Sequence, residues 1–267
     1  MTESKPLLVN PVIERLRAGD VAMGINIRMS RSSDIVRIAK TTGHDFIFID
    51  TQHALFDLQA IGEMAHTAQA IGVCPLVRVR SVDDPDVSLL LDCGVQGIVF
   101  PDVNNAAMAR KGVETCRFAP RGKRSVGGGY MQFDYRALPL DQMIGALDES
   151  TLVICMIETV EGLANVEEIA AVKGVDILHL GTNDLLVNMG IPGQFDHPKA
   201  VEAQNRVIAA AKANGIYSGC GGNRDVARQT AAIRNGVQFT TTQTDTAFLV
   251  SAATQWTKSV REQLAKA

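Results

Sequence analysis

Short apolar runs alternate with longer segments of helical periodicity along most of the chain. Eight of these runs are rich in apolar and β-branched residues and are predicted to be strands. They are AMGINI (22–27), FIFID (46–50), PLVRV (75–79), GIVFP (97–101), LVICMIE (152–158), VDILHLG (175–181), IYSGC (216–220) and VQFTTT (237–242). Most segments between them carry apolar residues three and four positions apart, as amphipathic helices do. The pattern therefore predicts an α/β protein.

Strands that are apolar at nearly every position are typical of a parallel sheet covered by helices on both faces. Eight strand–helix units in 267 residues predict a single-domain (β/α)8 TIM barrel over residues 1–267, with a doubly wound sheet as the alternative. A final helix is expected at 246–267. The longest interruption, 119–142, contains RGKRSVGGGY, which we interpret as a solvated loop or as an anion-binding loop.

Composition and charge narrow the classes of function. A content of 46% hydrophobic and 21% charged residues fits an ordinary soluble globular protein, and a net charge of -3 gives no indication of nucleic-acid binding. No apolar run is long enough to span a membrane, and the first twenty residues lack the pattern of a signal peptide. The five cysteines show no CxxC spacing, so we expect reduced thiols and a cytoplasmic location.

Two acidic residues follow neighbouring strands at the end where a barrel carries its chemistry. Glu158 ends the fifth predicted strand and Asp184 follows the sixth. Adjacent strands lie about 4.8 Å apart, so both carboxylates can reach one hard divalent cation. The alternative is that both residues cap helices.

Arginine and histidine side chains lie at two other strand ends. Arg78 and Arg80 are two residues apart, so strand alternation would point both inward. We interpret Arg78 either as a bidentate clamp for a substrate carboxylate or as the ion-pair partner of Asp50. His53 follows the second strand, and with an acid such as Asp92 it would form a general base. The alternative for His53 is a turn residue without a catalytic role.

Taken together, these segments resemble the HpcH/HpaI aldolase family, the metal-dependent class II aldolases related to the citrate lyase β-subunit. The resemblance runs from about residue 12 to 262. The segments that carry it are FIFIDTQHALFD, PLVRV, LLLDCGVQGIVFP, RFAPRGKRSVG, MIETVEGLANVEEIAAVKGVDILHLGTNDL and TQTDTAFL.

The resemblance implies a (β/α)8 barrel with its C-terminal helix exchanged between subunits, in a homo-oligomer that is usually a hexamer built as a trimer of dimers. It implies that Glu158 and Asp184 hold a divalent metal ion, Mg2+ or Mn2+ ahead of Co2+ or Zn2+. Arg78 would contact the 2-oxoacid, and His53 would be the acid/base, oriented by Asp92 from a neighbouring subunit. The implied reaction is reversible cleavage of 4-hydroxy-2-oxoacids, through a metal-bound enolate, into an aldehyde and pyruvate or a close 2-oxoacid such as hydroxypyruvate.

Three residues depart from the family pattern. Gln52 stands where the family usually has Glu, Met156 where it usually has Gln, and Asn26 where an aromatic residue is common. With Arg78 and Asn183 they form the predicted substrate-binding set, and we expect retained enolate chemistry with an altered choice of substrate. The alternatives are another enolate lyase, such as an oxaloacetate decarboxylase or an acyl-CoA lyase, and a non-catalytic barrel that binds carboxylates.

Overall fold

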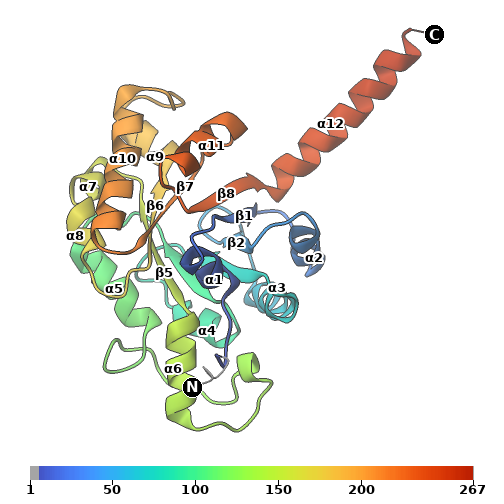
Figure 1. Cartoon of the computed structure of the whole chain (residues 1–267). Coiled ribbons are helices and arrows are strands. Elements are labelled where there is room, and N and C mark those ends of the chain that lie inside the picture. Colours follow the sequence, from blue (N-terminus) through green and yellow to red (C-terminus); the bar gives the residue numbers. More distant parts are fainter. Residues whose placement is uncertain (1–5, 267) are drawn as a thin grey trace.

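The strands form one closed parallel barrel in the computed structural model, which describes residues 6–266 (Figure 1). Each strand pairs with the next in chain order, and β8 pairs with β1. The strands are β1 (Ala22–Ile27), β2 (Phe46–Asp50), β3 (Cys74–Arg78), β4 (Gly97–Phe100), β5 (Leu152–Ile157), β6 (Ile177–Gly181), β7 (Tyr217–Gly221) and β8 (Phe239–Thr244). The predicted (β/α)8 barrel is confirmed, and the doubly wound sheet is excluded because the sheet has no free edge.

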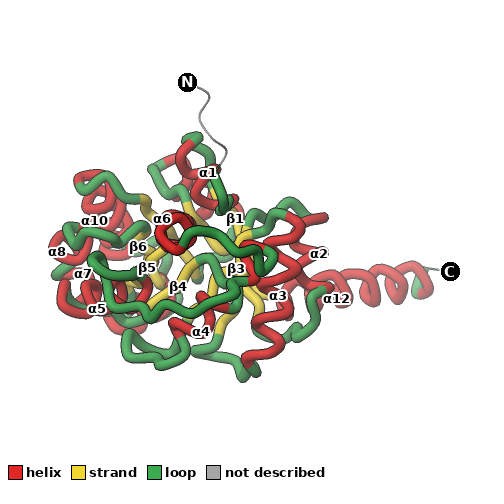
Figure 2. The backbone as a smooth tube through the Cα atoms, turned by 90° about the horizontal axis from the view of Figure 1, so that it is seen from below, coloured by secondary structure: helices red, strands yellow, loops and turns green. Residues whose placement is uncertain are grey.

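Helices surround the strands on the outside of the barrel, as Figure 2 shows from below. They are α1 (Pro11–Arg17), α2 (Asp34–Thr41), α3 (Leu58–Ile71), α4 (Val87–Asp92), α5 (Ala106–Cys116), α6 (Leu140–Ser150), α7 (Val160–Ala164), α8 (Val166–Ala170), α9 (Thr182–Asn188), α10 (Pro198–Ala213) and α11 (Val226–Arg234), with a 3-10 turn at Met131–Phe133. The helices α1, α6 and α9 were not expected. Two of them, α1 and α9, have only seven residues, which is too short for a periodic pattern to stand out.

The alternation of side chains along the strands divides the core into two layers. One layer fills the barrel and includes Phe46, Phe48 and Phe239, with Val12 and Leu16 of α1 packed against it. The other layer lies between the strands and the surrounding helices. Because residues two apart share a face of a strand, the same alternation decides which polar side chains reach the interior near the mouth.

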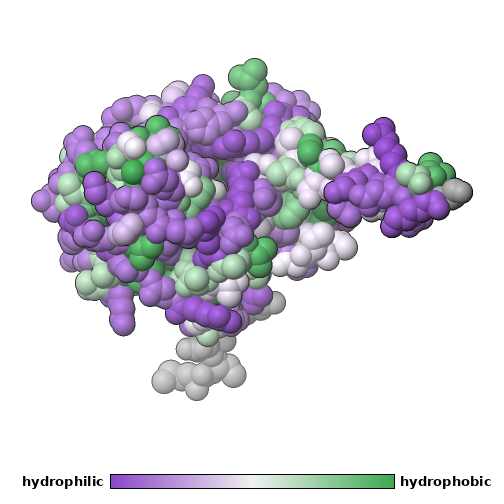
Figure 3. Space-filling model, turned by 90° about the horizontal axis from the view of Figure 1, so that it is seen from above, coloured by the Kyte–Doolittle hydropathy of each residue, from purple (hydrophilic) through white to green (hydrophobic). Residues whose placement is uncertain are grey.

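The last helix, α12 (Asp245–Leu264), extends away from the barrel (Figure 1). It exposes Leu249, Trp256 and Leu264, and Trp256 is 75% accessible. Figure 3 shows apolar side chains among the polar ones on this projecting helix. Twenty helical residues reach about 30 Å, so most of α12 lies beyond the barrel it belongs to. Among residues 6–266, no helix combines the length and the apolar composition needed to cross a membrane.

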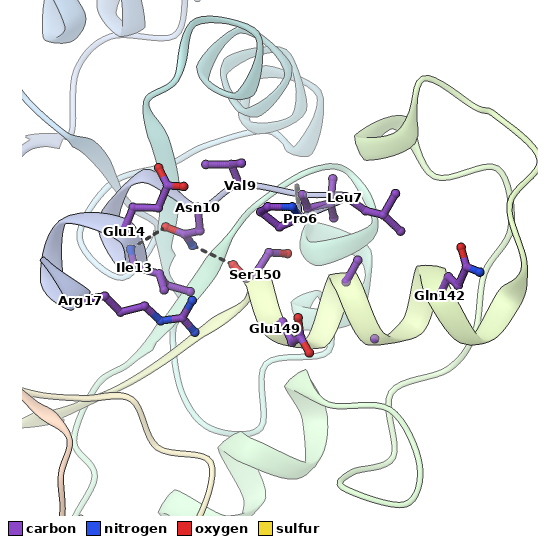
Figure 4. A pocket seen from close by; sticks show the side chains of 13 residues that line it. Pro6, Leu7, Val9, Asn10, Ile13, Glu14, Arg17, Gln142, Glu149 and Ser150 are labelled. Atoms are coloured by element: carbon purple, nitrogen blue, oxygen red, sulfur yellow. Dashed lines mark hydrogen bonds between the residues drawn. The ribbon is translucent and has the colours of Figure 1, made fainter. Parts of the chain in front are cut away.

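A cavity of about 680 Å³ lies between the N-terminal segment, α1 and α6 (Figure 4). Asn10 lines this cavity. Its side-chain amide donates to the carbonyl oxygen of Ser150 at 2.7 Å, and its Oδ1 accepts from the backbone N–H of Val12 at 3.0 Å. This contact ties α1 to the end of α6. The cavity is remote from the carboxyl ends of the strands, where barrels carry their chemistry, so it is not the candidate site.

Candidate functional site

A second cavity, of about 60 Å³, opens at the carboxyl ends of the strands. Its volume corresponds to about two water molecules, at roughly 30 Å³ each. Five of the predicted site residues line it: Asn26, Arg78, Met156, Asn183 and Asp184. The structure therefore brings together side chains that are far apart in the sequence, at the end of the barrel where the sequence placed them.

The side of the mouth formed by β1, β2 and β3 holds a buried network of opposite charges. Asp50, fully buried at the end of β2, accepts hydrogen bonds from Arg78 Nε at 2.9 Å and Arg78 Nη2 at 2.7 Å. Arg28 Nε donates to the same carboxylate at 2.6 Å. Burial by itself raises the pKa of Asp50, but the hydrogen bonds and charges of Arg78 and Arg28 outweigh it and hold that pKa below its usual value.

These contacts decide between the two interpretations of Arg78. The ion pair with Asp50 is confirmed, and it takes up the bidentate edge of the guanidinium. Arg78 therefore does not present that edge to a substrate carboxylate, as the clamp required. Its remaining nitrogen, Nη1, lies 3.8 Å from the sulfur of Met156 and faces the cavity wall.

Arg80 does not point into the mouth, contrary to expectation. Strand β3 ends at Arg78, so the alternation of the strand no longer applies two residues later. Arg80 instead pairs with Asp84 at 3.0 Å and with Asp86 at 3.1 Å, and its side chain is exposed.

The loop that carries Arg28 is held by the first residue of α12. Asp245, buried beside β8, accepts hydrogen bonds from the backbone N–H groups of Arg28, Met29 and Ser30 at 2.7–3.3 Å. Burial opposes its ionisation, but these backbone donors lower the pKa of Asp245 below its usual value. The base of α12 thus fixes one wall of the mouth.

The opposite side of the mouth holds a carboxylate that is only half satisfied. Glu158 is 3% exposed, and its Oε1 accepts from the backbone N–H of Asp102 at 2.8 Å. Its Oε2 is buried without a hydrogen-bond partner among the described residues. Burial raises the pKa of Glu158 to about 7, and the carboxylates of Asp102 and Asp184 add to the rise. An unpartnered buried oxygen of this kind costs free energy unless a ligand meets it.

The helix-capping interpretation of the two acids is wrong. Thr159, not Glu158, caps α7, with its side chain accepting from the backbone N–H of Gly162. Asp184 lies in the first turn of α9, and Gly181, the residue that precedes this helix, provides no side-chain cap. Neither carboxylate therefore caps the N-terminus of a helix.

The site has the properties expected of a place for a divalent cation. Gly181 leaves room beside Glu158, because a Cβ at this position would lie 2.5 Å from Oε2. Asp184 lies nearby at the cavity wall, and its charge reaches Glu158. Residues 6–266 contain no group of three or more acidic, histidine or cysteine side chains arranged as a metal cage. Two carboxylates with open positions suit Mg2+ or Mn2+, which keep water or take substrate oxygens as further ligands.

Four predicted residues lie outside the cavity lining: Glu158, which is buried behind it, and His53, Gln52 and Asp92. His53 is exposed, and its backbone N–H donates to Asp50 Oδ1 at 3.3 Å. Gln52 has a buried Oε1 without a partner in the described part of the chain. Asp92 pairs with Arg124 at 2.6 Å and forms no hydrogen bond with His53 of the same chain. The expectation that a neighbouring subunit supplies Asp92 stays a prediction.

The glycine-rich segment RGKRSVGGGY has a structural role that neither interpretation foresaw. The side chain of Arg124 is fully buried, pairs with Asp92 and stacks over Phe118 with its Cζ 4.5 Å from the ring centre. Lys123 pairs with Glu114 at 2.5 Å. With Arg121, which lies 3.7 Å from Asp148, each of the three cations of this segment has an acidic partner in the chain.

Three titratable residues that line the cavity were missed from the sequence: His179, Arg28 and Arg224. His179 is 2% exposed, and burial, with Arg78 nearby, lowers its pKa to about 3, so the imidazole is neutral at physiological pH. Its position two residues after the inward-facing Ile177 of β6 is a signal in the sequence that it points into the barrel. Arg28 directly follows the end of β1, and no sequence signal singled out Arg28 or Arg224.

Comparisons with known proteins agree with this geometry. Residues 28–252 match the family model HpcH/HpaI aldolase/citrate lyase. The chain is 33% identical over 94% of its length to a 4-hydroxy-4-methyl-2-oxoglutarate aldolase of Chaetomium globosum, of which the match covers 95%. It is 32% identical over 95% of its length to a hydroxypyruvate/pyruvate aldolase of Cupriavidus necator, covering 93% of that protein.

A solved structure supports the same relationship. The HpcH/HpaI aldolase of Desulfitobacterium hafniense superposes with a TM-score of 0.90 at 30% identity, covering 95% of this chain and 98% of that one. The match extends over nearly the whole of both chains in sequence and in fold. This chain belongs to the HpcH/HpaI aldolase/citrate lyase family.

Proposed function

We propose that this protein is a divalent-metal-dependent class II aldolase that reversibly cleaves 4-hydroxy-2-oxoacids into an aldehyde or ketone and pyruvate or a close analogue. One observation carries the proposal: Glu158 leaves a buried oxygen without a partner among the described residues, beside Gly181, which lines the cavity together with Asp184 and Arg78. The relatives named above, which are aldolases of 2-oxoacids, support the same reaction class.

Glu158 and Asp184 would hold the cation, Mg2+ or Mn2+ in preference to Co2+ or Zn2+, because both offer hard carboxylate oxygens. When bound, such an ion supplies Lewis-acid polarisation of the keto group of the oxoacid, an effect of several kcal/mol. Glu158 has to be ionised for this role, and a cation offsets the burial that otherwise raises its pKa.

Arg78 would stabilise the negative charge that develops on the oxoacid during cleavage. Asp50 holds Nε and Nη2, so the side chain needs no reorganisation when the charge appears. Nη1 is the atom left to donate to the oxoacid, as in an oxyanion hole. Met156 lies beside this nitrogen, so the hydrogen-bonding Gln of the family pattern is replaced by a thioether. Asn26 and Asn183 complete the polar wall around the substrate.

His53 would move the proton of the hydroxyl group that becomes the carbonyl of the leaving aldehyde. It lies directly after β2, and its backbone contact with Asp50 keeps that turn at the mouth. The exposed imidazole is free to reach this hydroxyl through a water molecule, which suits a general base.

Proton exchange on pyruvate tests the proposal without knowledge of the natural aldehyde. The protein is incubated with pyruvate and Mg2+ or Mn2+ in D2O, and the methyl signal is followed by NMR. We expect loss of the signal that depends on the metal ion and stops when a chelator is added. Loss that is equally fast with chelator would contradict the metal assignment, and no exchange with any of the four metal ions would favour a carboxylate-binding barrel.

We further infer that a second copy of this chain covers α12. The helix carries exposed apolar side chains away from its own barrel, including Leu249 and Trp256. Exchange of α12 between two copies would bury these side chains. It would also bring a surface of the partner to the mouth, where His53 forms no ion pair with an acid among the described residues of its own chain. Repetition of this dimer gives the trimer of dimers expected from the resemblance.

Light scattering and the fluorescence of Trp256, the one tryptophan of the chain, test this assembly. We expect a mass that is a multiple of the single chain and a blue-shifted emission, because Trp256 is exposed in the isolated chain. Trp256→Glu should dissociate the assembly, whereas Lys258→Gln on the same helix should not. A monomeric mass with solvent-exposed emission would refute the inference.

A further inference from the structure

Asp102, the second residue after β4, has an unusual backbone conformation at the mouth of the barrel. Its φ of 51° lies in the left-handed region, where residues other than glycine are uncommon because the Cβ crowds the backbone. Asp102 is exposed to solvent, so burial of its side chain does not impose this conformation. A strained residue of this kind persists only where its surroundings hold it, and such residues gather at functional sites.

The left-handed turn directs two successive backbone N–H groups at the same part of the sheet. The N–H of Asp102 donates to Glu158 Oε1 at 2.8 Å, and the N–H of Val103 donates to the carbonyl oxygen of Met156, on β5, at 3.2 Å. In an extended chain, successive N–H groups point to opposite sides. Both can reach the end of β5 only because the backbone turns at Asp102, between them. The conformation therefore serves the hydrogen bond to Glu158.

Further contacts bind the loop after β4 to the turn that follows Glu158. Asn104 Oδ1 accepts a hydrogen bond from Thr159 Oγ1, and the carbonyl oxygen of Asn104 accepts from Asn165 Nδ2 at 2.8 Å. The two segments are thus joined on both sides of Glu158. Asp102 is the point at which this loop contacts the carboxylate itself.

The hydrogen bond from Asp102 decides which oxygen of Glu158 is left for a ligand. Oε1 accepts the N–H of Asp102, whereas Oε2 is buried without a partner among the described residues. Oε2 lies on the side of Gly181, which lines the cavity. The terminal torsion of a glutamate is otherwise broad and nearly two-fold, so a carboxylate without such a donor could turn freely. One fixed donor on Oε1 keeps Oε2 on the side of the cavity.

We propose that Asp102 is a positioning residue for Glu158: its left-handed backbone presents an N–H that fixes Oε1, so that Oε2 stays available to a divalent cation. The inference rests on the proposed function and specifies how one of its metal-binding carboxylates is oriented. Groups that orient a metal ligand are often backbone groups, and their loss typically lowers the metal affinity about 10- to 100-fold.

Three neutral substitutions at this position separate the backbone conformation from the charge of the side chain. Asp102→Gly and Asp102→Asn tolerate a left-handed backbone, whereas Asp102→Val disfavours it because its Cβ is branched. Mn2+ binding is measured by electron paramagnetic resonance of the free ion, with Glu158→Ala as the reference for loss of the site. We expect Asp102→Val to bind Mn2+ about 10- to 100-fold more weakly than Asp102→Asn and Asp102→Gly. Equal affinities of the three neutral variants would overturn the inference.

Asp134 offers a matched control for the strain itself. Its φ of 53° is nearly that of Asp102, and it is also exposed, but it lies in the segment before α6. Asp134→Val should therefore lower the stability to urea and leave the Mn2+ affinity at the native value. If Asp102→Val does not fold, Asp102→Ala takes its place and should still bind Mn2+ more weakly than Asp102→Gly, because any Cβ is disfavoured at this φ.

A loss of stability alone would also overturn the inference. If Asp102→Val unfolds at lower urea but binds Mn2+ as tightly as Asp102→Asn, the left-handed conformation only shapes the loop and does not orient Glu158.

Metal binding and proton exchange together separate this inference from the proposed function. If the variants bind Mn2+ in the expected order but the native protein exchanges no protons of pyruvate, the aldolase proposal fails and the role of Asp102 survives. If exchange depends on the metal ion but the three neutral variants bind Mn2+ equally, the aldolase proposal stands and the role of Asp102 is refuted. Native binding of Mn2+ no tighter than that of Glu158→Ala would refute both the metal assignment and the role of Asp102.

Discussion

The two sides of the barrel mouth each contain a buried carboxylate, but only one of the two carboxylates has charged partners in the fold. On the side of β2 and β3, Asp50 meets Arg78 and Arg28, and its pKa lies below the usual value despite its burial. On the side of β5 and β6, Glu158 keeps an oxygen without a partner in the described chain, and burial raises its pKa to about 7. A buried charge is costly unless it is paired. The buried carboxylate of the first side is thus satisfied by the fold itself, whereas that of the second side needs a ligand to satisfy its free oxygen.

Removal of Glu158 tests the functional side and should have the largest effect. We expect Glu158→Ala to slow pyruvate exchange and aldol cleavage by about 10³-fold or more, because several kcal/mol of charge stabilisation are lost. Its resistance to urea should stay the same or increase, since an unpartnered buried oxygen disappears. Glu161→Gln, an exposed change on α7, is the control that should keep full activity. Full activity in Glu158→Ala would end the proposal for this residue.

Removal of Asp50 tests the structural side. We expect Asp50→Asn to lower the free energy of unfolding by about 3–5 kcal/mol, because the two arginines lose their shared counterion. Urea denaturation measures this change, and an unaltered m-value shows that the same cooperative unit unfolds. Asp196→Asn breaks an exposed ion pair with Arg228 and should leave the midpoint nearly unchanged. Equal effects of the two substitutions would contradict the distinction drawn here.

Arg78 connects the two sides, and a conservative substitution separates its roles. Arg78→Lys keeps a positive charge for Asp50 but loses the donor that faces the substrate, so kcat should fall about 100-fold with little change in KM. Steady-state kinetics with either hydroxy acid measures the split. Arg80→Lys, at an exposed position paired with Asp84, serves as the control and should show native kinetics. A change confined to KM would show that Arg78 only binds the ground state.

The pH dependence of the unfolding free energy should be a smaller effect, and its direction can be predicted. The arginines hold the pKa of folded Asp50 below its unfolded value of about 3.9, so its contribution is fully present above that pH. It is lost as the pH falls through the folded pKa. We therefore expect the difference in unfolding free energy between the native protein and Asp50→Asn to shrink below about pH 4. A difference that grows on acidification would reverse the assigned sign.

Strand positions were predictable because burial on both faces leaves a strong local signal. All eight expected strands are present, with ends displaced by no more than two residues. Glu158 and Asp184 were found in the same way, since a carboxylate directly after an apolar strand is unusual. Arg80 was misplaced because alternation holds only while the strand lasts, and β3 ends two residues earlier.

The partner of each charged side chain could not be read from the chain. Asp92 was predicted only as an acid for His53, and its contact with Arg124 depends on how the loop at 119–142 folds back over α4. Which charges meet is decided by loop packing over distances that sequence spacing does not record.

By itself, the sequence determined the barrel, the end of the barrel that carries the chemistry, and the two acids placed there. These follow from local periodicity and from the rule that parallel strands bring their carboxyl ends to one face. Only the tertiary structure decided that Asp50 is matched by two arginines, whereas an oxygen of Glu158 has no partner among the described residues. The reason is physical: the free energy of a charge depends on its burial and on its neighbours in space, which exist only once the barrel has closed.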